Sequence, residues 1–156
     1  MAAILELRAE IEAIIKGMYG IDYLRASPEE ANMALDRLNT NDCIAIHIDQ
    51  TTVNTDVSMG SYIVKNIPTE IFFVYKNISI DQTVAQTDEL IDNAETMADE
   101  FYDKLIQSAV INDVVAIPGY DLERLEAYKK YDATFSGVMF TCDIPVNRKT
   151  YYCSTN

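Results

Sequence analysis

The sequence has few of the residues that build metal centres, disulfide frameworks and phosphate-binding surfaces. Its 156 residues include one histidine, three cysteines and no tryptophan, and 12 basic residues stand against 25 acidic ones, for a net charge of −13. Cys43, Cys142 and Cys153 lack metal-ligand spacing, which favours free thiols in a reducing compartment. Nucleic-acid binding needs clustered Lys and Arg side chains. The composition therefore argues against direct DNA binding and against docking on an anionic membrane, and we expect no cofactor.

Long apolar runs and linker-like segments are also missing. No stretch approaches the roughly 20 apolar residues that a membrane span needs. Glu6, Arg8 and Glu10 interrupt the apolar residues at the start, unlike the core of a signal peptide. Only five Gly and four Pro occur, and no repeat is apparent. We therefore expect a soluble, cytoplasmic protein with a single domain over residues 1–156 and a flexible C-terminal tail at about 147–156.

Three segments have the apolar spacing of amphipathic helices. In the first, near the N-terminus, apolar residues recur every three or four positions, with Gly17 or Gly20 as the predicted end. Residues 28–38 follow Ser27, and Glu30 stands three positions after that serine, which is the pattern of a capping box. The longest segment, at about 84–109, carries an apolar stripe, and acidic residues occupy much of its remainder. We expect this helix to pack on a sheet with its acids in water.

Strands are predicted at residues 21–25, 43–49, 61–76 and 133–146. In residues 43–49 isoleucines alternate with other side chains, which predicts one face on the core. The third strand is expected to be interrupted near residues 66–68, where Pro68 marks a bend, a bulge or an edge, because proline cannot donate to a sheet ladder. The polar residues 50–60 are typical of a loop.

The pattern of the last strand changes partway along. Phe135 lies on one face of the alternation, whereas Val138 and Phe140 lie on the other. Such a shift beside Gly137 predicts a β-bulge in this strand. The preceding residues 120–132 have apolar spacing that fits a helix and an alternation that fits a strand, so both alternatives stay open.

The order of these segments predicts the fold class. Strands follow one another between helices with hairpin-length connections, which favours an α+β fold with a mostly antiparallel sheet. The long amphipathic helix at about 84–109 would pack on one face of that sheet. The N-terminal helix and the short helix 28–38 complete the prediction.

Residues for catalysis or metal binding are scarce. His47 and Asp49 share the non-isoleucine face of their strand and are the only weak candidates for a metal site, which normally needs three or four ligands. A lone histidine on a strand is more often a structural residue. Cys43 and His47 would lie about 13 Å apart along a strand, too far for a Cys–His catalytic pair. No phosphate-binding glycine loop or nucleophile motif is present, so we expect no enzyme.

Contacts with other chains are expected in two regions. Tyrosine is favoured at protein interfaces because its ring is apolar and its tip is polar. The segment 50–61 and the tail after Pro145 are the most plausible places for such contacts. The candidate interface residues are Val57, Met59, Tyr62, Tyr151 and Tyr152.

Three stretches carry a resemblance to a known family: SYIVKNIPTEIFFVYKN, TDELIDNAETMADEFYDKLIQS and ERLEAYKKYDATFSGVMFTCDIPV. A starting helix, a long interrupted β-arm, one long amphipathic helix and a closing strand pair resemble the tail terminator, or tail-completion, proteins of tailed phages. The similarity covers roughly residues 40–146, as a pattern and without a catalytic motif. The helix 28–38 and the tail after residue 146 have no counterpart in that pattern.

The resemblance implies a fold, partners and a location. The fold would be the α+β one, with residues 120–132 as a strand. The protein would be a structural subunit that forms a homo-oligomeric ring and joins other tail or neck proteins, in the bacterial host cytoplasm or the virion tail. Its negative charge would let DNA slide through the ring without sticking. Two alternatives stay open: a cytoplasmic small-molecule or protein binding module with a pocket under the long helix, and a small enzyme built on His47 and Asp49.

Overall fold

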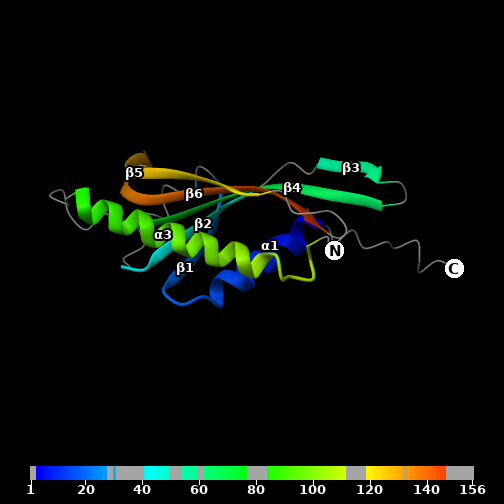
Figure 1. The fold of residues 1–156 in the computed structure, drawn as a ribbon, viewed down its shortest axis with the longest axis horizontal. Coiled ribbons are helices and arrows are strands. Elements are labelled where there is room, and N and C mark those ends of the chain that lie inside the picture. Colours follow the sequence, from blue (N-terminus) through cyan, green and yellow to red (C-terminus); the bar gives the residue numbers. More distant parts are fainter. Residues whose placement is uncertain are drawn as a thin grey trace.

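In the residues that the computed structural model describes, a six-stranded sheet carries two helices on one face (Figure 1). The described residues are 3–27, 30, 41–49, 54–59, 62–76, 84–111, 119–131 and 133–146. No helix within these ranges is both long and apolar enough to cross a membrane. The predicted tail at about 147–156 lies outside them.

The two helices follow the predicted amphipathic patterns. Helix α1 spans Ala3–Lys16 and helix α3 spans Val84–Leu105. Gly17 follows the last turn of α1, and Gly20 has a φ of 75° in the turn to the next strand, a conformation that glycine adopts without steric cost. Helix α3 ends four residues before the predicted boundary, because the amides of Gln107 and Ser108 bond three residues back instead of four. The predicted N-terminal and long helices are confirmed.

The sheet is mostly antiparallel, as predicted. Its strands run in the order β1-β2-β4-β6-β5, and β3 pairs with β4 off this path. Only the β1–β2 pair is parallel. The strand bounds are Ile21–Ala26 for β1, Cys43–Ile48 for β2, Asn54–Met59 for β3, Tyr62–Lys76 for β4, Asp121–Tyr131 for β5 and Ala133–Val146 for β6. Within the ambiguous residues 120–132, Asp121–Tyr131 therefore form a strand and not a helix.

Buried apolar clusters lie on both faces of the sheet. The larger one joins α1 and α3 to the sheet and includes Leu7, Phe73, Phe101 and Phe140. The second lies on the opposite face and includes Ile44, Ile46, Phe72, Val74 and Phe135. All six residues of β2 are buried, so the prediction that only one face of this strand meets the core is wrong. The isoleucines fill the second cluster, while Cys43 and Ala45 fill the first.

The change of pattern in β6 has a different origin from the one predicted. β6 pairs with β4 in unbroken register from Phe135 to Val146. Its alternation does not shift, because Phe135 faces the second cluster and Val138 faces the first. The irregularities lie in the neighbouring strand, where the register shifts twice. Leu125 and Tyr128 pair with Gly137 and Phe135, which leaves one extra residue in β5, and Tyr131 pairs with Ala133, which leaves a second. The predicted bulge is therefore next to Gly137 but on the other strand.

Strand β4 is continuous through Pro68, so the predicted interruption is wrong, but the predicted edge position agrees with the pairing of the described strands. Pro68 pairs with Asp143 of β6 on one side. On the other side β2 pairs with residues 71–74 and β3 with residues 62–66, so Pro68 falls between these two partners. On that side no described strand pairs with Pro68, so the missing N–H of this proline breaks no hydrogen bond of the sheet. The predicted loop 50–60 is also wrong in part, because residues 54–59 form β3.

The capping box is confirmed, although the helix that it would begin lies outside the described residues except for Glu30. The Glu30 amide donates to Ser27 Oγ at 3.3 Å, and the Ser27 amide donates to Glu30 Oε2 at 3.4 Å. These reciprocal bonds satisfy two amides that would otherwise lack partners at a helix start.

Candidate functional site

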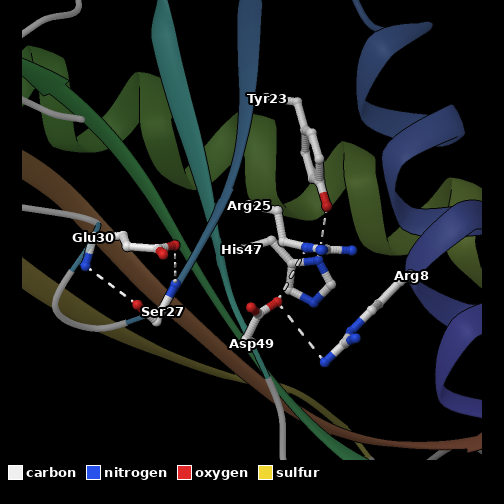
Figure 2. A network of polar contacts seen from close by, with 7 residues as sticks. All are labelled: Arg8, Tyr23, Arg25, Ser27, Glu30, His47 and Asp49. Carbon is white, nitrogen blue, oxygen red and sulfur yellow. Dashed lines mark hydrogen bonds and ion pairs between the residues drawn. The ribbon is translucent and has the colours of Figure 1, made fainter. Parts of the chain in front are cut away.

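His47 is buried on the face of β2 that α1 covers (Figure 2). Its side chain is 3% exposed. The imidazole Nδ1 lies 3.0 Å from the Tyr23 hydroxyl, with which it shares a hydrogen bond. Tyr23 belongs to β1, whose parallel pairing with β2 places Arg25 directly opposite His47. The only histidine of the chain is thus a hydrogen-bonded interior residue, as a lone strand histidine was expected to be.

Asp49 follows β2 and is held by two guanidinium groups. Its Oδ1 lies 3.1 Å from Arg25 Nε and 3.8 Å from Arg8 Nη2 of α1. This oxygen is itself buried, and both contacts are ion pairs without hydrogen-bond geometry. Figure 2 shows Arg8, Arg25, Asp49 and His47 converging between α1 and the two strands. We call these four residues and Tyr23 the His47 cluster.

The electrostatics of the cluster keep the imidazole neutral. The pKa of His47 is lowered to about 4, mainly by burial and then by the positive charges of Arg8 and Arg25, while the Asp49 carboxylate opposes this shift. Burial also raises the pKa of Tyr23 to about 12, so this hydroxyl keeps its proton. At neutral pH the cluster therefore holds two guanidinium cations, one carboxylate and an uncharged imidazole.

His47 and Asp49 were weak candidates for a metal site, but their surroundings do not suit a metal ion. The Asp49 carboxylate already faces two cations, which oppose a further positive ion at the same place. Within the described ranges, no group of three or more His, Cys, Asp or Glu side chains is arranged to hold a metal. Among the described residues, Asp49 is the only acid that acts on the imidazole, so the alternative of a small enzyme built on this pair gains no support from further acids there.

The described cysteines are core residues. Cys43 and Cys142 are free and buried. Burial raises the pKa of each thiol to about 12, so neither provides a thiolate at neutral pH. The interpretation of these two cysteines as core thiols is confirmed, and Cys153 lies outside the described residues.

Three of the five candidate interface residues come together in one hairpin. Val57 and Met59 lie in β3, Tyr62 begins β4, and Met59 pairs with Tyr62 across the turn. In Figure 1 this β3–β4 hairpin extends beyond the part of the sheet that the helices cover. Tyr151 and Tyr152 lie outside the described residues. Sequence reasoning missed β3 because its polar residues lack apolar alternation, although Gly60 and the Val and Thr residues around it were a usable hairpin signal.

The space under the long helix is filled by aromatic rings. Phe101 of α3 packs against Phe73 and Phe140 of the sheet, with ring centroids 5.7 and 5.4 Å away. Tyr120 stacks on Phe140 at 5.1 Å and lies 4.3 Å from Tyr102. The pocket that a binding module would need beneath this helix is therefore occupied by side chains of the chain itself.

A shallow hollow lies elsewhere, along β5 and β6. It has a volume of about 290 Å³ and is lined by Gly119, Asp121, Thr141, Cys142 and Asp143. Ligand pockets commonly enclose about 300 to 1,000 Å³ and are mostly apolar. This hollow is at the small end of that range, and two of its lining residues are exposed acids.

The acidic face of α3 is tied to β5 by polar contacts. Arg124 of β5 lies 3.4 Å from Asp88 and 3.7 Å from Asp92. The Tyr120 hydroxyl donates a hydrogen bond to Asp99. Most of the remaining acids on this helix, such as Glu95 and Asp103, are exposed, as the predicted wet face requires.

Comparison with known proteins adds no assignment, since no family model and no curated protein matches this chain.

Proposed function

We propose that this protein is a non-enzymatic structural subunit that assembles into a ring, in the manner of the tail terminator proteins of phage tails and necks. The observation that carries the proposal is the β3–β4 hairpin. Its β4 part begins at Tyr62, whereas pairing with β6 begins only at Lys65 and pairing with β2 only at Ile71. The end of this hairpin extends past the residues that pair with β2 and β6, so its strand edges can pair with a neighbouring subunit.

The charge of the chain fits the same role. A net charge of −13 repels DNA, so a ring of such subunits would let DNA pass without binding it. The partners under this proposal are further copies of the chain and other tail or neck proteins, in the host cytoplasm or the virion. The shared pattern of the three resembling stretches supports this choice over other ring-forming roles.

The alternative function is a cytoplasmic binding module. The hollow beside β5 is the feature that favours it, because Thr141 and two carboxylates could orient a small polar ligand there. The hollow's small size and its position away from the long helix make this the second choice.

Light scattering of the purified chain tests the ring proposal. Mass is measured across protein concentrations at low and moderate salt, and electron microscopy then shows whether the particles have a central opening. We expect a closed oligomer of defined mass. A monomer at every concentration would contradict self-assembly and would place the binding module first.

Two matched variants test the role of the hairpin. Val57→Asp places a charge on β3, whereas Val84→Asp makes the same change at a valine that is 80% exposed on α3. We expect Val57→Asp to raise the protein concentration at which the oligomer forms by at least tenfold. Val84→Asp should leave that concentration unchanged. Equal behaviour of the two variants would contradict the hairpin as the interface, provided that both retain the circular dichroism of the parent.

A further inference from the structure

The His47 cluster contains more cations than anions at the point where α1 meets the sheet. Arg8 of α1 and Arg25 of β1 both lie near the buried imidazole, and Asp49 is their shared counter-ion. Helix α1 also carries Glu6, whose Oε1 is buried, Glu10, and Glu12, which pairs with Lys16 at 2.7 Å. Across the sheet, the β4 residue opposite His47 is the apolar Ile71. Among the described residues, the charged groups that act on the imidazole are Arg8, Arg25 and Asp49, so cations outnumber anions there by two to one.

Protonation of the imidazole would strain this junction electrostatically. It would add a positive charge between two guanidinium groups in a buried place, which is repulsive and poorly solvated. Both ring nitrogens would then be N–H donors, and the Tyr23 hydroxyl would accept the hydrogen bond from Nδ1. The repulsion favours moving Arg8, and with it α1, away from the sheet.

Helices α1 and α3 share the larger apolar cluster, but different polar contacts tie them to the sheet. Arg8 connects α1 to Asp49 beside His47. Helix α3 is instead tied to β5 through Tyr120–Asp99 and through Arg124 with two aspartates, and none of these groups belongs to the His47 cluster. Helix α1 contacts β1, whereas α3 contacts β4, β5 and β6 (Figure 1), and the two helices also contact each other.

We propose that His47 is an acid-sensitive latch, and that its protonation releases α1 from the sheet while α3 and the antiparallel strands remain folded. Release would expose Leu7, Ile11 and Ile15, which are buried in the larger cluster. The latch is independent of ring assembly, since it concerns contacts within one subunit.

Hydrogen exchange with mass spectrometry tests the latch at pH 7 and pH 5, with rates corrected for the intrinsic effect of pH. Both values lie above the isoelectric point of about 4.3, where most carboxylates stay ionised. A histidine that titrates near 4 when closed and near 6.5 when open raises the opening equilibrium roughly 20-fold between these pH values. We expect that increase for amides of Ala3–Lys16. We also expect these amides to exchange faster than those of Val84–Leu105 at both pH values, because under the latch α3 opens only when the whole domain unfolds.

His47→Gln should abolish the increase, because glutamine does not titrate in this range. If His47→Gln fails to fold, Arg8→Met supplies the second test: removing the guanidinium should raise the pKa of His47, which NMR follows without assignment because the chain has one histidine. Lys16→Met is the matched control on the same helix and should leave that pKa unchanged. Equal opening of α1 and α3, no opening at pH 5, or persistence of the effect in His47→Gln would each overturn the latch.

Discussion

A Cβ atom added at Gly137 would lie 2.1 Å from the carbonyl oxygen of Phe73 and 2.7 Å from Cα of Val74. Both obstacles are backbone atoms of β4, the strand that pairs with β6 along its whole described length from Phe135. Position 137 therefore requires glycine, because the two central strands β4 and β6 approach each other too closely there for a side chain. One of the two extra residues in β5 lies beside it, where Leu125 pairs with Gly137.

We predict that Gly137→Ala lowers the free energy of unfolding by about 3 kcal/mol, because the methyl group can fit only if the two strands separate. Urea unfolding followed by circular dichroism measures the change. Gly119→Ala is the control, since an added Cβ there meets no atom within 4 Å. The control should stay within about 1 kcal/mol of the parent. Equal effects of the two substitutions would contradict the close approach of the strands.

The stability of the protein should depend on pH through His47. The unfolded chain takes up a proton on this histidine below a pH of about 6.5, whereas the folded chain does so only near the lowered pKa of about 4. The unfolded state therefore binds more protons in this window, and stability is lost as the pH falls from 6.5 to 4. The loss should reach about 2 kcal/mol between pH 7 and pH 5.

Urea midpoints at several pH values, measured for the parent and for His47→Gln, isolate this contribution. Carboxylates titrate in both proteins, so their effect cancels in the difference between the two curves. If the difference in unfolding free energy between the parent and His47→Gln stays constant from pH 7 to pH 5, the imidazole is solvated in the folded protein and the prediction is wrong.

The link between Tyr120 and Asp99 should contribute to stability apart from ring packing. Tyr120→Phe keeps the stacking on Phe140 and the contact with Tyr102 but removes the hydroxyl that donates to the Asp99 carboxylate. We expect the free energy of unfolding to fall by about 1 to 2 kcal/mol, as for a hydrogen bond to a charged group.

A double-mutant cycle with Asp99→Asn checks whether this loss comes from the link itself. Asp103→Asn is the matched control, because Asp103 is an exposed acid one turn further along α3. The effect of Tyr120→Phe should shrink in the Asp99→Asn background and stay unchanged in the Asp103→Asn background. Additive effects with Asp99→Asn would show that the hydroxyl contributes nothing through this carboxylate.

Local patterns in the sequence were sufficient to predict the helices and most strands. The apolar stripe of α3 and the spacing in α1 specify their buried faces, since a helix brings every third or fourth residue to the same side. Ser27 and Glu30 predict their reciprocal bonds for a similar reason, because the two residues meet within a single turn. The candidate site was predictable only in part: His47 and Asp49 could be named, but neither Arg8 nor Tyr23 could be.

The sequence by itself determined the two helices α1 and α3, most of the strands and the α+β class, because each depends on side chains a few positions apart. Tertiary structure alone decided the burial of both faces of β2, the continuity of β4 through Pro68 and the placement of the extra residues in β5. It also decided the convergence of Arg8, Tyr23 and Arg25 on His47. These features depend on which strand or helix becomes the neighbour, and contacts between distant segments leave no periodic signal in the chain.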